Sequence, residues 1–245
     1  MPTDTPSDPS MEGTASLDHE SSVSDSKPVY TGKPMTFFRH MSAITGYGMT
    51  PDSVEEYRRD FDDYYAETLC KRCEDNRDWL IQYSPIVRFM MDQIKEVNGS
   101  LTRDNIKCLP CKKDQAGGFN PKYGILLCQN KLRDRNHTED TIAHEMVHAY
   151  DHMRFKVDWA DFKHLACSEI RASTLSGECR PYQEWVVRGQ WKFLRHMEAC
   201  VRRRATLSVS GHPALKGDLE AAGRIVDQVF ESCYKDTRPF REVYK

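Results

Sequence analysis

Apolar positions recur at helical spacing in two stretches that follow the first fifty residues. The first stretch, from Asp52 to about Trp79, is otherwise polar, and its spacing predicts one long helix. The second begins at Pro85, runs to about Val97 and ends at Asn98-Gly99, a dipeptide that stops helices. We interpret both helices as scaffold. The apolar positions that carry these predictions are Tyr57, Phe61, Tyr64, Tyr65, Leu69, Ile86, Phe89, Met90 and Ile94.

The pattern changes between Ile106 and Gln129. Proline and glycine residues there interrupt short apolar runs such as Gly124 to Cys128. Short runs bounded by turn-forming residues are typical of small strands. The segment therefore predicts a small antiparallel sheet.

Helical spacing returns in the second half of the chain. One helix is predicted from about Thr138, its N-cap, to Met153, and another from about Asp161 to Ser176, where Gly177 ends it. Two more helical stretches span residues 182–204 and 217–235. The predicted fold class is therefore α+β, mostly helical, with a small sheet.

The helix that begins near Thr138 carries a metal-binding pattern, in which His144, Glu145 and His148 form the motif His-Glu-x-x-His. Histidines four residues apart lie one turn apart on one helix face, so both can bind the same ion. Zn²⁺ with three protein ligands keeps one position for water, and Glu145 can accept the proton of that water and pass it to a departing amine. The motif predicts peptide hydrolysis by a zincin-like domain.

Chance is a poor explanation of this motif, because a shuffled chain of the same composition would contain it only about 0.02 times. The neighbouring residues Ile142, Met146, Val147, Ala149 and Tyr150 are uncharged, as a helix buried beneath a metal site requires. The alternative is that the two histidines are core residues, each satisfied by backbone partners.

Glu169 is the preferred third metal ligand. It lies twenty residues beyond His148 on the next predicted helix, and a buried carboxylate requires a cation or another partner. The alternatives are that Glu169 extends to solvent or pairs with an arginine such as Arg171. Its helical position places it in the apolar stripe of Phe162, Leu165, Ala166 and Ser173.

Other candidate ligands have poorer reach. His152 lies about 12 Å along the helix axis from His144, too far to share its ion. Asp151 stands where a glycine turn would be needed to return a later histidine, and His164 and Asp158 remain weaker substitutes. The candidates for stabilising the oxyanion are Tyr150, His152 and His164.

The N-terminal region differs in composition from the rest of the chain. Residues 1–26 contain six acidic residues and no Lys or Arg, which predicts disorder and resembles neither a secretory signal nor a matrix presequence. We therefore expect an extension over residues 1–34 and one catalytic domain over 35–245. Phe37 and Phe38 come just after the extension, and such a pair is expected to pack on its own core rather than on a membrane.

Composition narrows the partners and the compartment. The formal net charge is −2, so no global basic field attracts nucleic acid, and no apolar run approaches the roughly 20 residues that span a bilayer. Nine cysteines favour disulfides and an oxidising compartment, with at least one thiol left over. The alternative is a structural zinc held by the two closely spaced pairs, Cys70 with Cys73 and Cys108 with Cys111.

Several segments together resemble one family, the mitochondrial inner-membrane-associated metalloproteases that mature ATP synthase subunit 6. The resemblance covers roughly residues 45–245. The matching segments are His144–His148, Val157–Trp159, Ala166–Ala172, Leu175–Cys179, Cys200–Ala205 and Asp236–Phe240.

This resemblance implies a peripheral protein on the intermembrane-space side of the mitochondrial inner membrane. It implies removal of the N-terminal propeptide from the precursor of ATP synthase subunit 6, and separate assistance in assembling the membrane sector of that enzyme. The family's catalytic assignment falls on His144, Glu145 and His148, whereas Glu169 rests on the helix geometry given above. Zn²⁺ is the expected cofactor.

Two other functions fit parts of the sequence. The motif also resembles DNA-associated metallopeptidases of the SprT type, but the one dense basic run, Arg202 to Arg204, is typical of a solvated helix face or a lipid contact. We therefore expect no nucleic-acid partner. An assembly chaperone with a dispensable metal site is the second alternative, and it is compatible with proteolysis.

Overall fold

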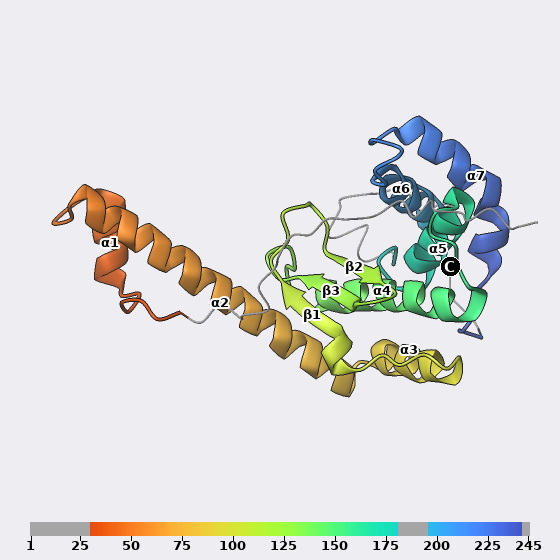
Figure 1. Cartoon of the computed structure of the whole chain (residues 1–245), viewed down its shortest axis with the longest axis horizontal. Helices are drawn as coiled ribbons and strands as arrows, with labels where there is room; N and C mark the ends of the chain where they lie inside the picture. Colours follow the sequence, from red (N-terminus) through yellow and green to blue (C-terminus); the bar gives the residue numbers. More distant parts are fainter. Residues whose placement is uncertain (1–29, 181–195, 242–245) are drawn as a thin grey trace, which may run out of the picture.

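The computed structural model describes residues 30–180 and 196–241 of the chain (Figure 1). Helices dominate these two ranges and surround one small sheet, so the α+β fold class is confirmed. No helix within them has both the length and the apolar composition needed to cross a bilayer. The predicted disorder of residues 1–26 concerns a segment that lies outside the described residues.

Helix α2 (Pro51–Tyr83) forms an arm whose first half projects away from the rest of the molecule (Figure 1). The Thr50 hydroxyl caps its N-terminus, and Pro51 occupies the first turn, where no backbone N–H is needed. The helix runs four residues past the predicted end because Leu80 still packs into the core. A short helix, α1 (Phe37–Thr45), lies beside the outer half of α2 and was not predicted.

The aromatic pair at the start of α1 does not pack on a core. Phe37 is 72% exposed and Phe38 is 81% exposed, so the expectation that they dock on their own domain is wrong. The reason is that α1 faces α2 with its polar side chains instead.

Ser84 joins α2 to α3 (Pro85–Glu96) through a shared cap. Its backbone N–H donates to the Leu80 carbonyl at 2.9 Å, and its hydroxyl accepts from the Val87 N–H at 3.2 Å. As predicted, α3 stops before Asn98, which adopts a left-handed φ of 63°.

The small sheet contains β1 (Ile106–Leu109), β2 (Gly117–Asn120) and β3 (Gly124–Cys128), which follow a short 3-10 turn, η1 (Arg103–Asn105). Strand β3 lies in the centre, antiparallel to β2 and parallel to β1. The prediction of an antiparallel sheet is therefore wrong for β1. Strands β2 and β3 form a hairpin, and it is the second strand of that hairpin that joins β1, so the two run in the same direction.

Helix α4 (Arg135–Phe155) packs against the sheet and against α3. It begins earlier than predicted because the Asp134 carboxylate accepts the His137 N–H at 2.8 Å and so provides the cap. Thr138, the predicted N-cap, is buried inside the helix instead. The first of two buried hydrophobic clusters lies between α2, α3, α4 and the sheet. It includes Leu80, Val87, Met90, Ile106, Ile125, Leu127, Ile142 and Met146.

Three further helices pack on one another beside α4: α5 (Phe162–Leu175), α6 (His196–Ser210) and α7 (Leu219–Lys235). Gly177, with φ of 93°, follows α5 as predicted. Of the predicted stretch 182–204, the part before residue 196 lies outside the described residues. Helix α6 runs on to Ser210 because Val209 still packs into the buried cluster. Their shared cluster includes Ala166, Ile170, Val201, Ala205, Val209, Val226 and Phe230.

The preference for disulfides over a cysteine-bound zinc is confirmed in the described residues. The two closely spaced pairs do not act as units, and Cys70 is buried outside the disulfides, so one thiol is left over as expected. Because β1 and β3 are parallel, their C-terminal ends lie together. The disulfide between Cys111, just after β1, and Cys128, the last residue of β3, joins the chain there. The four bonds are Cys73–Cys108, Cys111–Cys128, Cys167–Cys233 and Cys179–Cys200.

The bond between Cys167 and Cys233 joins α5 to α7 over a separation of 66 residues. Replacing both residues by serine should lower the free energy of unfolding by about 4 kcal/mol, because the unfolded chain regains the entropy of that loop. Urea denaturation without reductant measures the change. Cys70→Ala, which breaks no disulfide, should cost only about 1 kcal/mol, and equal losses for both variants would contradict the prediction.

Candidate metal centre

Two histidines of α4 and one glutamate of α5 converge at the boundary between the two helices. The Nε2 atoms of His144 and His148 are 3.1 Å apart. The Glu169 carboxylate places one oxygen 3.4 Å from Nε2 of His144 and the other 3.6 Å from Nε2 of His148. The structure therefore brings together the three ligands that the sequence predicts.

In residues 30–180 and 196–241, these three are the group of His, Cys, Asp or Glu side chains that lie close enough together to hold one ion. One ligand atom from each of His144, His148 and Glu169 lies within 4.8 Å of the other two. Glu169 is only 7% exposed, which agrees with its predicted inward direction. Arg171, the alternative partner for Glu169, forms its ion pairs with Asp151 and Asp236 instead.

A second glutamate, Glu178, lies on the other side of the His144 ring. Its Oε1 is 3.3 Å from Nδ1 of His144, and its other oxygen pairs with Arg204 of α6. Glu178 was not predicted from the sequence. This residue follows the helix end at Gly177, so no helical periodicity relates it to the motif. The imidazole of His144 is thus held between two carboxylates.

These surroundings affect the two imidazoles differently. Burial lowers the pKa of both rings, but at His144 the adjacent Glu178 and Glu169 outweigh burial and raise its pKa well above the usual value. At His148 burial prevails over Glu169, and the pKa falls to about 4. The metal-free site therefore attracts one positive charge and holds it on His144.

The residues fit a bound divalent cation. Glu169 Oε2 is buried without a hydrogen-bond partner, although it lies 3.4 Å from Nε2 of His144. Burial acts to raise the pKa of Glu169, but His148 and His144 outweigh it and lower that pKa to about 2. A buried carboxylate in this state needs a cation. Two imidazole nitrogens and one carboxylate oxygen form a donor set that binds Zn²⁺ in peptidases.

His148 is oriented by a chain of buried hydrogen bonds. The Ser168 hydroxyl donates to Asp151 Oδ2 at 3.0 Å and lies 2.8 Å from Nδ1 of His148. Because that hydroxyl proton is used, Nδ1–H of His148 is the donor to Ser168, and Nε2 is left with its lone pair toward Glu169 and His144. Arg171 completes the chain by donating Nε–H to Asp151 at 3.0 Å.

Glu145 lies beside the ligands and is 6% exposed. Burial raises its pKa to about 7, with Glu169 and Glu178 adding to the effect and His144 opposing it. Gly117, at the start of strand β2, lies directly against it. A Cβ at that glycine would come 2.7 Å from Thr141 Cγ2 and 3.2 Å from Glu145 Oε1. The edge strand of the sheet therefore approaches Glu145 as closely as glycine allows.

The other candidates from the sequence lie outside the cluster. The indole N–H of Trp159 donates to Nδ1 of His152 at 3.3 Å, and that indole packs 5.8 Å from the His148 ring, centroid to centroid. His164 is exposed and accepts the backbone N–H of Asp158. Tyr150 is buried with its ring against Phe155. Neither His152 nor His164 belongs to the cluster of ligand atoms around His144.

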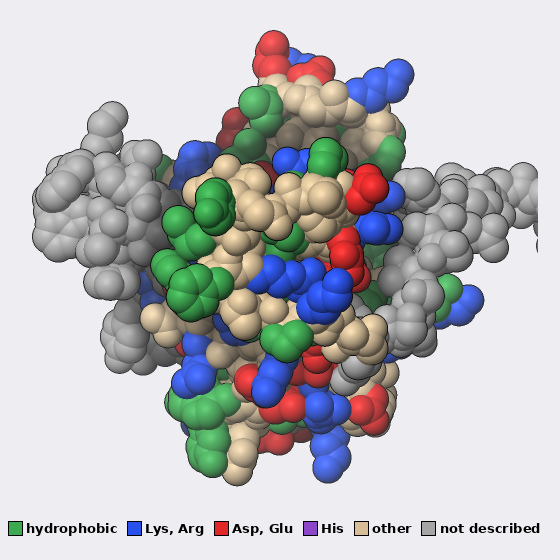
Figure 2. Space-filling model, turned by 90° about the vertical axis from the view of Figure 1, so that its left-hand side faces the viewer, with side chains coloured by type: hydrophobic (Ala, Val, Ile, Leu, Met, Phe, Trp, Pro, Cys, Tyr) green, Lys and Arg blue, Asp and Glu red, His purple; other side chains and the backbone are tan. Residues whose placement is uncertain are grey.

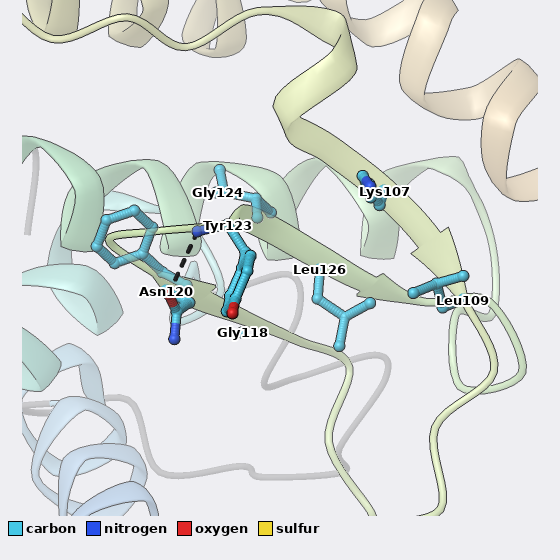
Figure 3. A pocket seen from close by; sticks show the side chains of 9 residues that line it. Lys107, Leu109, Gly118, Asn120, Tyr123, Gly124 and Leu126 are labelled. Carbon is cyan, nitrogen blue, oxygen red and sulfur yellow. Dashed lines mark hydrogen bonds between the residues drawn. The ribbon is translucent and has the colours of Figure 1, made fainter. Parts of the chain in front are cut away.

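A separate shallow pocket of about 320 Å³ lies on the sheet (Figure 3). Residues that alternate with the buried ones line it, among them Lys107, Leu109 and Leu126, and Tyr123 at the hairpin turn. Asn120 accepts the Tyr123 N–H across that turn. None of the metal-centre residues lines this pocket.

Known proteins match most of this chain. The model of the peptidase M76 family matches residues 71–241, a segment that contains both histidines, Glu145, Glu169 and Glu178. The chain belongs to this family. It is a family of metallopeptidases, so the chain is a metallopeptidase and a divalent metal is its expected cofactor.

Three fungal relatives, each called mitochondrial inner membrane protease ATP23, illustrate the similarity. The Coccidioides immitis protein is 54% identical over 80% of this chain and 83% of its own length. The Neosartorya fischeri protein is 52% identical over 91% and 94%, and the Eremothecium gossypii protein 50% identical over 82% and 85%. No solved structure matches. These relatives place the chain among proteases of the mitochondrial inner membrane.

Glu178→Gln should lower the affinity for Zn²⁺ about 10- to 100-fold, because the neutral amide no longer holds the His144 ring as a charged partner. Isothermal titration of the metal-free protein measures it. Glu198→Gln, on the partly exposed side of α6, is the matched control and should leave the affinity unchanged. An unaltered affinity in Glu178→Gln would show that this carboxylate does not support the ligand.

Asp151→Ala should lower the free energy of unfolding by about 3 kcal/mol, because the buried Arg171 would lose one of its two carboxylate partners and keep only Asp236. Urea denaturation of the metal-free protein separates this loss from any change in metal binding. Asp114→Ala removes a carboxylate that is 95% exposed and pairs with Lys131, and should cost about 0.5 kcal/mol or less. Similar losses in both variants would refute the assigned role of Asp151.

Proposed function

We propose that the chain is a zinc metalloendopeptidase in which His144, His148 and Glu169 hold the metal and Glu145 moves the proton. The observation that carries this proposal is the convergence of the three ligand atoms within 4.8 Å on two buried helices. The catalytic domain in this proposal spans residues 35–245, with residues 1–34 as an N-terminal extension.

Glu145 performs the proton transfers of peptide hydrolysis in this proposal. When bound, Zn²⁺ acts as a Lewis acid toward the scissile carbonyl and the attacking water. Glu145 accepts the proton of that water and then delivers it to the departing amine. In the metal-free site burial raises the pKa of Glu145 to about 7, so this carboxyl group both accepts and releases a proton near neutral pH. The approach of β2 at Gly117 limits the space in which Glu145 can move.

The proposed location is the intermembrane-space side of the mitochondrial inner membrane, with peripheral attachment. The names of the relatives support the membrane, and four disulfides fit an oxidising compartment. The proposed substrate is the precursor of ATP synthase subunit 6, from which the enzyme removes the N-terminal propeptide. We also propose assistance in assembling the ATP synthase membrane sector.

The basic run of α6 gives no support to a nucleic-acid partner. Arg202 pairs with Glu198 and Asp227, and its guanidinium lies 3.5 Å from the centroid of the Phe230 ring. Arg204 pairs with Glu178 beside the metal centre. Arg202 therefore serves helix packing, and Arg204 contacts a carboxylate beside the metal site.

Glu145→Gln should keep the metal and lose about 10²- to 10⁴-fold of the cleavage rate, because the ligands survive while the proton acceptor is lost. Metal content is measured by mass spectrometry and cleavage by appearance of the mature substrate. His148→Ala and Glu169→Ala should lose the metal itself, whereas Glu220→Gln, on the exposed surface of α7, should retain metal and activity.

If Glu145→Gln processed the substrate precursor at the wild-type rate, the proposed peptidase mechanism would be refuted. Full metal content in Glu169→Ala would remove Glu169 from the ligand set. ATP synthase assembly that proceeds in cells containing only Glu145→Gln would show that the assembly role is independent of cleavage.

A further inference from the structure

Helix α1 presents its polar side to the protein and its apolar side to the solvent. Arg39 forms an ion pair with Asp60 of α2, and its guanidinium lies 5.3 Å from the centroid of the Tyr57 ring. His40 Nδ1 contacts the Tyr57 hydroxyl. An amphipathic helix on a soluble domain normally packs the other way round, with its apolar stripe on the core.

The exposed side of α1 forms one apolar patch. Phe37, Met41 and Ile44 follow the spacing of a single helix face, and Phe38 lies next to them. Tyr47, just after the helix, is exposed as well. Their exposed fractions are 72% for Phe37, 81% for Phe38, 39% for Met41, 66% for Ile44 and 85% for Tyr47. Several large apolar side chains exposed on one helix face mark an interaction site.

The patch lies at the outer end of the arm (Figure 1). Seen from that end, hydrophobic side chains emerge in several groups among charged ones (Figure 2). Along α2, hydrogen bonding to the catalytic core begins at Ala66, whose carbonyl accepts from Gln129. The preceding part of the helix, from Pro51, extends roughly 20 Å beyond the core at 1.5 Å per residue. The patch is therefore held away from the metal centre.

Fixed charges do not explain what this patch binds. Between residues 30 and 50 the chain has only two of them, Lys33 and Arg39, and each is paired with an acidic residue of α2. The patch itself is uncharged and is made of two Phe, one Tyr, one Met and one Ile. Aromatic rings of this kind settle at the boundary between lipid headgroups and acyl chains.

We propose that the patch on α1 docks the enzyme on a lipid bilayer by burying its aromatic and aliphatic side chains at the headgroup boundary. The inference rests on the proposed function, in which a peripheral peptidase works at the inner membrane. A bilayer is the occupant that a convex, uncharged helix face at the end of a projecting arm fits best. The arm then sets the height of the metal centre above the lipid surface.

Phe37→Ser/Phe38→Ser should lower binding to vesicles of phosphatidylcholine and phosphatidylglycerol about tenfold, since two large rings leave the membrane boundary. Co-sedimentation of the full chain measures the bound fraction. The matched control is Leu207→Ser/Leu219→Ser, which changes side chains that are 48% and 52% exposed on α6 and α7 and should bind like the wild type. Binding to phosphatidylcholine alone, and in raised salt, should stay within about twofold, because burial of apolar surface carries it.

Equal vesicle binding by the two double variants would overturn the proposal. So would a wild-type dimer that Phe37→Ser/Phe38→Ser converts to a monomer without lipid, because the patch would then join two copies of the chain. Loss of binding only when phosphatidylglycerol is omitted would assign attachment to charge and also refute the inference. Metal content and cleavage by the Phe variant in detergent solution should be unchanged, so a failure of docking remains separate from a failure of the peptidase assignment.

Discussion

Negative charge buried around two imidazoles is the constraint on which the functional part of this molecule depends. Glu145, Glu169 and Glu178 all lie within the same water-poor region as His144 and His148. Carboxylates in such a place are costly unless a cation compensates them. In the metal-free protein a proton on His144 supplies part of the compensating positive charge, because Glu178 and Glu169 raise the pKa of this histidine. A divalent ion bound between the same groups would supply more positive charge.

The metal centre lies where the two buried clusters meet, so its geometry depends on how those clusters are joined. The histidines belong to α4, which packs under the sheet, whereas Glu169 belongs to α5, which packs on α6 and α7. Asp151 and Arg171 connect α4 to α5, and Arg171 also reaches Asp236 after α7. Ion pairs outside the ligand cluster therefore help determine whether the proposed ligands meet.

The sequence predicted the local parts of this arrangement and missed the parts that depend on tertiary contacts. Helical spacing was enough to place His144 and His148 on one face and to turn Glu169 inward. It could not find Glu178, because a residue after a helix end has no period that relates it to the motif. It also assigned β1 the wrong direction, since strand order depends on which hairpin strand reaches β1. The cap at Asp134 was missed because Thr138 offered an equally plausible local signal.

Helix α1 shows why hydrophobic periodicity leaves function open. A periodic pattern indicates that several side chains share one environment. It does not indicate whether that environment is a protein core, a partner protein or a bilayer. For Phe37 and Phe38 the ordinary expectation was a core, and the polar contacts of Arg39 and His40 with α2 are what exclude it. Apolar side chains facing outward lower the solubility of a free enzyme. Their outward arrangement is explained if α1 lies on a membrane surface, as proposed.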